Sequence, residues 1–391
     1  MRLASRMESI AESATLRVTR RALELKRQGV PVIDFGAGEP DFASPAVAVE
    51  AAREALAAGF TKYTANNGIP ELREALAERY RRDFGAPWDA ADTLVTVGGK
   101  GALFEAALAL FEAGTEVVLH SPAWVSFVEQ IRFAGATPVA VPTDGADGFA
   151  IRAEPLVAAL GPRTRAVILN SPCNPTGGVI EPAERRRLVE ACAERGIVVL
   201  SDETYERFVY DGFEPGSAAA LAAEFPDTVA VVGSFSKTYA MTGWRLGFLL
   251  GPRPLVDAAA CIQSHATSNA TSFAMKGAVA ALAGAEAEVA AMIAEYAARR
   301  ELLVERLRRL PGVRCAAPRG AFYAFPDISG RLDGDLSTPT DLAERLLEEE
   351  AVAVVAGEAF GSDRHVRLSF ACSRAALAEG MDRVERFLAR H

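Results

Sequence analysis

The chain has 391 residues, half of them hydrophobic and 24% charged, which predicts two or three folded domains and excludes a disordered or fibrous protein. Its 42 Lys and Arg residues against 51 Asp and Glu residues give a net charge of -9. Because no basic excess is available to neutralise phosphates or anionic lipids, neither nucleic acid nor a membrane is an expected partner.

The cysteines and the N-terminus indicate the compartment. The five cysteines are odd in number, widely scattered and without a C-x-x-C pair, so they predict neither a disulfide framework nor a zinc site. They are typical of thiols in a reducing cytoplasm. The N-terminus lacks an apolar core, and no later uncharged apolar run is long enough to span a bilayer. We therefore expect a cytoplasmic protein.

Short β-branched runs alternate with helical patterns through the middle of the chain. This alternation is typical of parallel strands joined by crossover helices, and it predicts one large α/β domain over residues 45–280. The runs contain few polar residues, so we expect helices to bury both faces of the sheet. The first run leads into a glycine turn, GGKG at 98–101, and an amphipathic helix. The predicted strands are 93–97, 116–120, 137–141, 166–170, 197–201, 229–233 and 246–251.

The pattern changes after residue 280. Apolar residues recur at helical spacing over 286–310, which is longer than a typical globular helix and suits a bridge between two domains. Beyond it, strands and helices no longer alternate strictly, which indicates a smaller α+β domain over 281–391. Its predicted strands are 321–325, 351–355 and 366–370, and its predicted helices are 340–350 and 374–390.

No metal centre or serine hydrolase is indicated, because the four histidines lie far apart and no G-x-S-x-G motif follows a strand. Polar residues instead follow the predicted strands, where open α/β sheets bind ligands. The GGKG segment suits an anion at a helix start, although most such glycines only form tight turns. SPCNPTGG at 171–178 directly follows a predicted strand and is a second candidate segment, although it can also be interpreted as a rigid loop. Asp202 and Tyr205 follow one strand and can face one cleft, although an acid there is more often a helix cap.

Three basic residues complete the set of candidates. Lys237 lies among hydroxyl groups in SFSKTYAMTGWRLGF at 234–248, between two predicted buried strands. Burial there would lower the pKa of its amine and make it nucleophilic, whereas most loop lysines are solvated. Arg245 follows in the same segment. Arg367 lies within an apolar strand, where it needs an anionic partner or a water-filled cleft.

Together these segments resemble the pyridoxal 5'-phosphate (PLP) dependent aminotransferases of fold type I, class I, and within them the bacterial aspartate aminotransferases of thermophile and rhizobial type. The resemblance covers nearly the whole chain. It implies a mixed, mostly parallel sheet flanked by helices, a smaller α+β domain, and an N-terminal segment, residues 1–44, that packs on the small domain. The matching segments are SATLRV, AGEPDF, KYT, NGIPELREAL, TVGGKGALF, SPAWVSF, NSPCNPTGG, SDETYE, SFSKTYAMTGWRLGF, GAFYAF and HVRLSFA.

The resemblance also implies roles at the PLP ring. Lys237 is expected to bind PLP covalently and to move a proton at the substrate Cα. Asp202 is expected to pair with the ring nitrogen and thereby to tune the cofactor. Tyr205 and Asn174 are expected to hydrogen-bond the 3'-oxygen of the ring, and Trp124 to stack on its face.

Further roles concern the phosphate and the substrate. The resemblance assigns the phosphate to the N–H groups of Gly99 and Lys100, to Ser234 and Ser236, and to Arg245. Tyr63 resembles a tyrosine that reaches the phosphate from the neighbouring subunit, which implies a homodimer with shared sites. Arg367 is expected to bind the α-carboxylate of the substrate, and Gly38 to close over it. Lys100, Ser13 and Thr15 match residues that bind the distal carboxylate of aspartate.

The expected reaction transfers an amino group between an L-amino acid, aspartate or glutamate, and a 2-oxo acid such as 2-oxoglutarate. The sequence departs from the subgroup at Ala123, where SPYW is usual, and at Cys173, where NSPNNPTG is usual. It also has Ala11-Glu12 in place of a Lys-Pro pair that is linked to prephenate use, and the absence of that lysine argues against a prephenate activity. Because of the departure at Ala123, a specialised biosynthetic, prephenate or aromatic substrate remains one alternative, and a PLP lyase or decarboxylase on the same fold is another.

Overall fold

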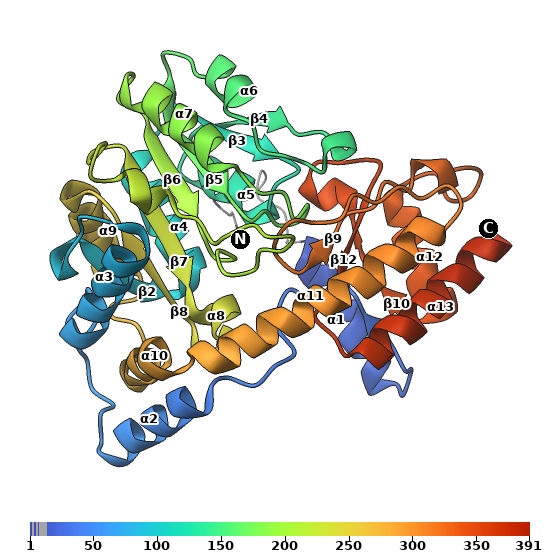
Figure 1. The fold of residues 1–391 in the computed structure, drawn as a ribbon, viewed down its shortest axis with the longest axis horizontal. Helices are drawn as coiled ribbons and strands as arrows, with labels where there is room; N and C mark the ends of the chain where they lie inside the picture. Colours follow the sequence, from blue (N-terminus) through green and yellow to red (C-terminus); the bar gives the residue numbers. More distant parts are fainter. Residues whose placement is uncertain (2–3, 5–6, 8–13) are drawn as a thin grey trace.

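The computed structural model describes residues 1, 4, 7 and 14–391. Its strands β2 (Thr93–Val97), β3 (Glu116–Ser121), β4 (Thr137–Pro142), β5 (Thr164–Asn170), β6 (Val198–Asp202), β7 (Val229–Ser234) and β8 (Leu246–Leu250) form one sheet. The strand order is β2-β8-β7-β6-β5-β3-β4 (Figure 1). Strand β8 is antiparallel to both of its neighbours, and all other pairs are parallel. The predicted mixed, mostly parallel sheet is therefore confirmed.

Helices cover this sheet in two layers. The layer on one face contains α3 (Pro70–Phe84), α6 (Ala153–Ala158), α7 (Pro182–Ala193) and α10 (Ser272–Gly284). The layer on the other face contains α4 (Gly98–Leu110), α5 (Val125–Phe133) and α9 (Arg253–Ala266). Successive side chains of a strand point to opposite faces, so Val118 packs in the first layer and Val117 and Leu119 pack in the second.

Burial on both faces was predicted for every strand, and for β4 the prediction is wrong. Most side chains of β4 are partly or fully exposed, whereas those of β8 are all buried. The reason is position and cover: β4 is an edge strand packed chiefly against α5, whereas β2, the other edge strand, is packed against α3, α4 and α9 and is buried. Two further helices, α2 (Ala46–Ala57) and α8 (Phe235–Thr238), pack against α10 and β8 respectively.

The second part of the molecule is built from both ends of the chain. Strand β1 (Ile33–Asp34) pairs in parallel with β10 (Val352–Ala353). Strands β11 (Val355–Ala356), β12 (Val366–Ser369) and β9 (Tyr323–Ala324) form a separate antiparallel sheet. The helices α1 (Ala14–Arg27), α12 (Pro339–Glu350) and α13 (Arg374–Arg390) complete this part.

One predicted strand of this part is wrong. Residues 351–355 do not form a single strand, because β10 and β11 belong to different sheets and the buried Val354 lies between them. The α+β arrangement itself is confirmed. The domain boundaries after residues 44 and 280 stay a prediction.

Helix α11 (Glu286–Arg309) connects the two parts of the molecule (Figure 1). Its Val289 packs with the α10 layer of the large sheet, whereas Met292, Tyr296 and Leu303 pack in the core of the second part. The predicted long helix is confirmed. No single described helix is long and apolar enough to cross a membrane, and α10 and α11 reach that length and composition only as a pair bent by 79°.

Candidate active site

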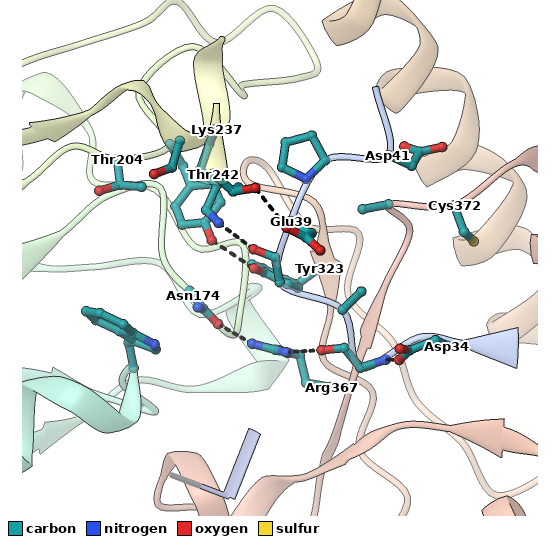
Figure 2. Close-up of a pocket in the computed structure, with 18 of the residues that line it drawn as sticks. Asp34, Glu39, Asp41, Asn174, Thr204, Lys237, Thr242, Tyr323, Arg367 and Cys372 are labelled. Atoms are coloured by element: carbon teal, nitrogen blue, oxygen red, sulfur yellow. Dashed lines mark hydrogen bonds between the residues drawn. The ribbon is translucent and has the colours of Figure 1, made fainter. Parts of the chain in front are cut away.

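A cavity of about 860 Å³ lies between the carboxyl ends of β5, β6 and β7, the start of α4 and the second part of the molecule. Residues 36–41, which we call the strap, leave β1 and line this cavity beside Lys237 (Figure 2). Twelve of the predicted site residues line the same cavity. They are Gly38, Gly99, Lys100, Trp124, Asn174, Asp202, Tyr205, Ser234, Ser236, Lys237, Arg245 and Arg367.

The start of α4 forms one end of the cavity. The helix begins at Gly98, whose φ of +73° makes the predicted glycine turn between β2 and α4, and the residues after it form the first helical turn. No side chain caps this end, and the N–H groups of a first turn have no partner within the helix. A β-carbon at Gly98 would lie 2.5 Å from Arg245 Nη2, and one at Gly99 would lie 3.3 Å from Ser234 Cβ. Backbone amides, a guanidinium and a hydroxyl therefore form a cup that suits an anion.

Asp202 lies at the end of β6 and is buried. Its Oδ1 atom accepts a hydrogen bond of 3.0 Å from the Thr204 N–H. Burial raises the pKa of this carboxyl, while the Thr204 hydrogen bonds and the Lys237 charge act in the opposite direction. Within the described part of the chain Asp202 forms no direct ion pair. A cationic ligand in the cavity would supply the missing partner.

Lys237 lies in the four-residue helix α8, which Ser234 begins by accepting the Ser236 N–H at 3.0 Å. The Lys237 amine donates a hydrogen bond to the Gly38 carbonyl of the strap (Figure 2). Burial lowers its pKa to about 8; the Glu39 charge opposes this shift, and the charges of Arg367 and Arg245 add to it. A lysine with so low a pKa is partly neutral near pH 7 and can attack a carbonyl carbon.

Arg367 lies on β12 and is almost completely buried. Its Nη1 atom donates to Asn174 Oδ1 at 3.0 Å and its Nη2 atom donates to the Gly36 carbonyl at 2.8 Å (Figure 2). The guanidinium lies 4.4 Å from the centre of the Tyr323 ring, and its Nε atom has no partner among the described residues. No carboxylate neutralises it directly within that part of the chain, so a bound anion would be its ion-pair partner.

Lys100 supplies a second cation to the cavity. Its Nζ atom lies 4.9 Å from the centre of the Trp124 ring. The residue is exposed by surface area, and partial desolvation of its amine inside the cavity mouth, followed by the positive charge of Arg245, lowers its pKa. Lys100 comes from α4 and Arg367 from β12, so the two cations approach the cavity from different parts of the molecule.

One cavity thus contains a nucleophilic lysine, a buried carboxylate and an anion-binding cup. Comparison of the chain with known protein families identifies the family that it matches. The profile of the family described as aminotransferase class I and II matches residues 30–384. The chain belongs to this family.

The aminotransferase is similar to its relatives over its whole length. A probable aspartate/prephenate aminotransferase of Aquifex aeolicus is 42% identical over 391 residues, which cover 99% of this chain and 98% of the relative. The crystal structure of the aspartate aminotransferase from Rhizobium meliloti matches with a TM-score of 0.94 and 39% identity, covering 100% of this chain and 99% of the other. The structure of the aspartate aminotransferase from Thermus thermophilus with maleate matches with a TM-score of 0.93 and 42% identity, covering 99% of this chain and 100% of the other.

Aminotransferases of this family use PLP, and the cavity of this chain fits that group. The cup at the start of α4 suits the phosphate. Asp202, a buried carboxylate without a direct ion pair, suits a protonated ring nitrogen, and the amine of Lys237 suits the aldehyde.

Three predicted site residues of the aminotransferase are not among the twelve that line the cavity. The side chain of Tyr63 is 90% exposed and does not line the cavity. Ser13 lies outside the described residues, as do Ala11 and Glu12, and of Thr15 the structure describes only the backbone, in α1. Ala123 is buried and does not line the cavity. The wall there is formed by Trp124.

Sequence reasoning missed several residues of the aminotransferase site. Thr204 holds Asp202, Tyr323 bonds the Tyr205 hydroxyl at 2.8 Å, and Glu39 of the strap accepts from Thr242 at 2.8 Å. Thr204 and Glu39 lie inside the segments SDETYE and AGEPDF, which pointed to their neighbourhood. Tyr323 lies inside the matching segment GAFYAF, but neither the sequence pattern nor the resemblance assigned a site role to a residue of that segment.

Proposed function

We propose that this aminotransferase acts on amino dicarboxylates, aspartate or glutamate, and uses a 2-oxo acid such as 2-oxoglutarate as the amino acceptor in a ping-pong reaction. The observation that carries the proposal is the pair of cations, Arg367 and Lys100, that line one cavity from different sides. One suits the α-carboxylate and the other suits a second carboxylate at the far end of the substrate. The names of the Rhizobium and Thermus proteins support the same substrate class.

PLP supplies, when bound, an aldehyde that reacts with amines and a ring that accepts electrons from the bond broken at Cα. In the proposal Lys237 holds it covalently, Asp202 keeps its ring nitrogen protonated, and Asn174 and Tyr205 bind its 3'-oxygen. Trp124 covers one face of the ring. The phosphate is held by the Gly99 and Lys100 amides, Ser234, Ser236 and Arg245.

Lys237 also has a proposed role in proton transfer. When it is not bound to the cofactor, the Lys237 amine would accept the proton from the substrate Cα. Its lowered pKa suits this role, because a neutral amine is needed to accept a proton. Gly38 and the strap limit access of water from the side of the cavity that they line.

A homodimer in the cytoplasm completes the proposal. Tyr63 is exposed, and α2 exposes Val47, Val49 and Leu56 nearby in the sequence. Exposed apolar side chains of this kind are typical of a surface that another protein covers. We propose that a second copy covers them and that its Tyr63 reaches the phosphate of the first.

The experiment that tests the substrate class replaces Lys100. In Lys100→Ala, KM for aspartate and glutamate should rise by at least about 30-fold, while KM for alanine stays nearly unchanged, because only dicarboxylates lose a charge pair. Steady-state kinetics with each donor measures this. Lys276→Ala is the matched control, since it removes a lysine that pairs with Glu71 outside the cavity.

Two outcomes would contradict the proposal. Equal losses with aspartate and alanine would mean that Lys100 serves the cofactor only. A wild-type enzyme that ignores aspartate would exclude the substrate class altogether. Prephenate belongs in the donor and acceptor panel, because the name of the Aquifex relative includes it.

A further inference from the structure

Asp34 lies at the point where the strap leaves the second part of the molecule. The backbone around it is fixed on both sides, since the Phe35 N–H donates to Ala353 at 2.9 Å and the Phe35 carbonyl accepts from the Ser369 N–H at 2.7 Å. Residues 32–34 already line the cavity, and from Gly36 onward the chain leaves these strands as the strap. Asp34 is therefore the last residue of β1 and immediately precedes this turn.

The side chain of Asp34 holds the first residue of the strap. Its Oδ1 atom accepts the Gly36 N–H at 2.9 Å (Figure 2). The opposite side of the same residue, the Gly36 carbonyl, accepts from Arg367 Nη2 at 2.8 Å. Asp34, Gly36 and Arg367 thus form one continuous chain of hydrogen bonds that ends at a guanidinium of the cavity.

The packing around Gly36 leaves little freedom for other arrangements. A β-carbon on Gly36 would lie 3.2 Å from Asp34 Oδ1 and 3.2 Å from Val18 Cγ1. The second carboxylate oxygen of Asp34 lies 4.0 Å from Lys26 Nζ of α1, and the Asp34 side chain is only 17% exposed. Burial lowers the pKa of Arg367, and the negative charge of Asp34 acts against that shift.

We propose that Asp34 is a positioning residue for the substrate. By accepting the Gly36 N–H, Asp34 orients the Gly36 carbonyl toward Arg367. This carbonyl in turn holds the Arg367 guanidinium in the orientation that binds a substrate carboxylate. The inference rests on the proposed role of Arg367. Asp34 acts through Gly36 and does not touch the substrate. Its loss should therefore weaken carboxylate binding and leave the chemical step intact.

Two variants of Asp34 separate the hydrogen bond from the charge. Asp34→Ala removes the acceptor, and the dissociation constant of maleate from the holoenzyme should rise about tenfold, as for loss of one hydrogen bond to a buried site. Asp34→Asn keeps an Oδ1 acceptor for the Gly36 N–H and should stay within about threefold of the wild type. Isothermal titration calorimetry with maleate, a dicarboxylate without an amino group, gives both values without turnover.

Kinetics and a matched control complete the design. KM for the amino donor should rise in Asp34→Ala by the same factor as the maleate constant, while kcat changes by less than about threefold. Asp144→Ala removes the same type of bond, from Asp144 Oδ1 to the Ala146 N–H at 2.8 Å, at an exposed turn outside the cavity. It should leave maleate binding unchanged. Gly36→Ala, which crowds Asp34 Oδ1, should weaken binding as Asp34→Ala does.

The outcomes distinguish this inference from the proposed function. Wild-type affinity in Asp34→Ala overturns the inference, and so does an Asn variant as weak as the Ala variant. Introducing Asp34→Ala into Arg367→Gln should cause no further loss, since the two residues act as one unit, and an additive loss would overturn the inference. If Arg367→Gln alone binds maleate normally, the role of Arg367 in the proposed function fails as well.

Discussion

Lys237 shows how local surroundings change the chemistry of one residue. With a pKa of about 8, about one amine in ten is neutral at pH 7, against fewer than about one in a thousand for an ordinary lysine. Covalent capture of PLP by the cofactor-free enzyme should therefore accelerate about tenfold per pH unit below pH 8 and level off above it. Stopped-flow absorbance between pH 6.5 and 10 measures the profile.

Lys237→Ala is the control for this profile. The variant should bind PLP reversibly through the cup and Asp202, and borohydride reduction should leave no adduct. An adduct on another lysine would contradict the assignment. A profile that levels off only near pH 10 would contradict the lowered pKa.

Residue positions within motifs could be predicted from the sequence, whereas contacts between distant segments could not. Lys237, Asp202 and Arg367 were candidates because each is a charged residue in or beside an apolar strand, and the resemblance to the family assigned their roles. The hydrogen bond between Tyr205 and Tyr323 joins residues 118 positions apart. It depends on how two parts of the molecule pack, and no local pattern encodes that packing.

Helix α4 contains a buried acid that the proposed reaction does not use. Glu105 is 3% exposed, its Oε2 atom has no hydrogen-bond partner among the described residues, and burial raises its pKa to about 8. Its folded-state pKa lies above the unfolded value, so its contribution to stability is present below about pH 4.5 and is lost as pH rises toward 8. At neutral pH the carboxyl is mostly protonated.

Glu105→Gln should remove this loss of folding stability at high pH, because the amide does not ionise. We expect the variant to have a free energy of unfolding roughly 2 to 4 kcal/mol above that of the wild type at pH 8 and nearly the same at pH 4.5. Chemical unfolding of the holoenzyme at fixed protein and PLP concentrations measures the difference. Glu112→Gln, at an exposed site after the same helix, should change stability by less than about 0.5 kcal/mol at either pH. A pH-independent gain would contradict the assignment.

Elements with strong local patterns were predicted well, and elements defined by partners were not. All seven strands of the large sheet lie within one or two residues of their predicted positions, because each is a short apolar run between turns. The exposure of β4 follows from its place at an edge of the sheet and from the few helices that cover that edge, and the division at Val354 follows from pairing with two different sheets. Neither order nor pairing is present in a local pattern.

At the scale of the whole molecule, one prediction concerns the assembly of two subunits. If Tyr63 serves the site of the second copy, a hybrid dimer of one Lys237→Ala and one Tyr63→Ala subunit contains one intact site. Randomly mixed subunits should then recover activity in about a quarter of all sites. If Tyr63 serves its own site, no site in the mixture is intact. Activity after co-refolding of the two variants, compared with each alone, measures this.

Helix α11 has a mechanical consequence for the two parts that it joins. Its 24 residues span about 36 Å at 1.5 Å per residue, with Val289 held at one end by the large sheet and Leu303 held farther along by the second part. A rigid rod of this length magnifies a small tilt, so that a rotation of about 5° about its first turn moves its last turn by about 3 Å. Arg367 belongs to the part at the far end and Lys237 to the part at the near end. A tilt of α11 relative to the large sheet would therefore move Arg367 relative to Lys237 and change the distance between the two walls of the cavity.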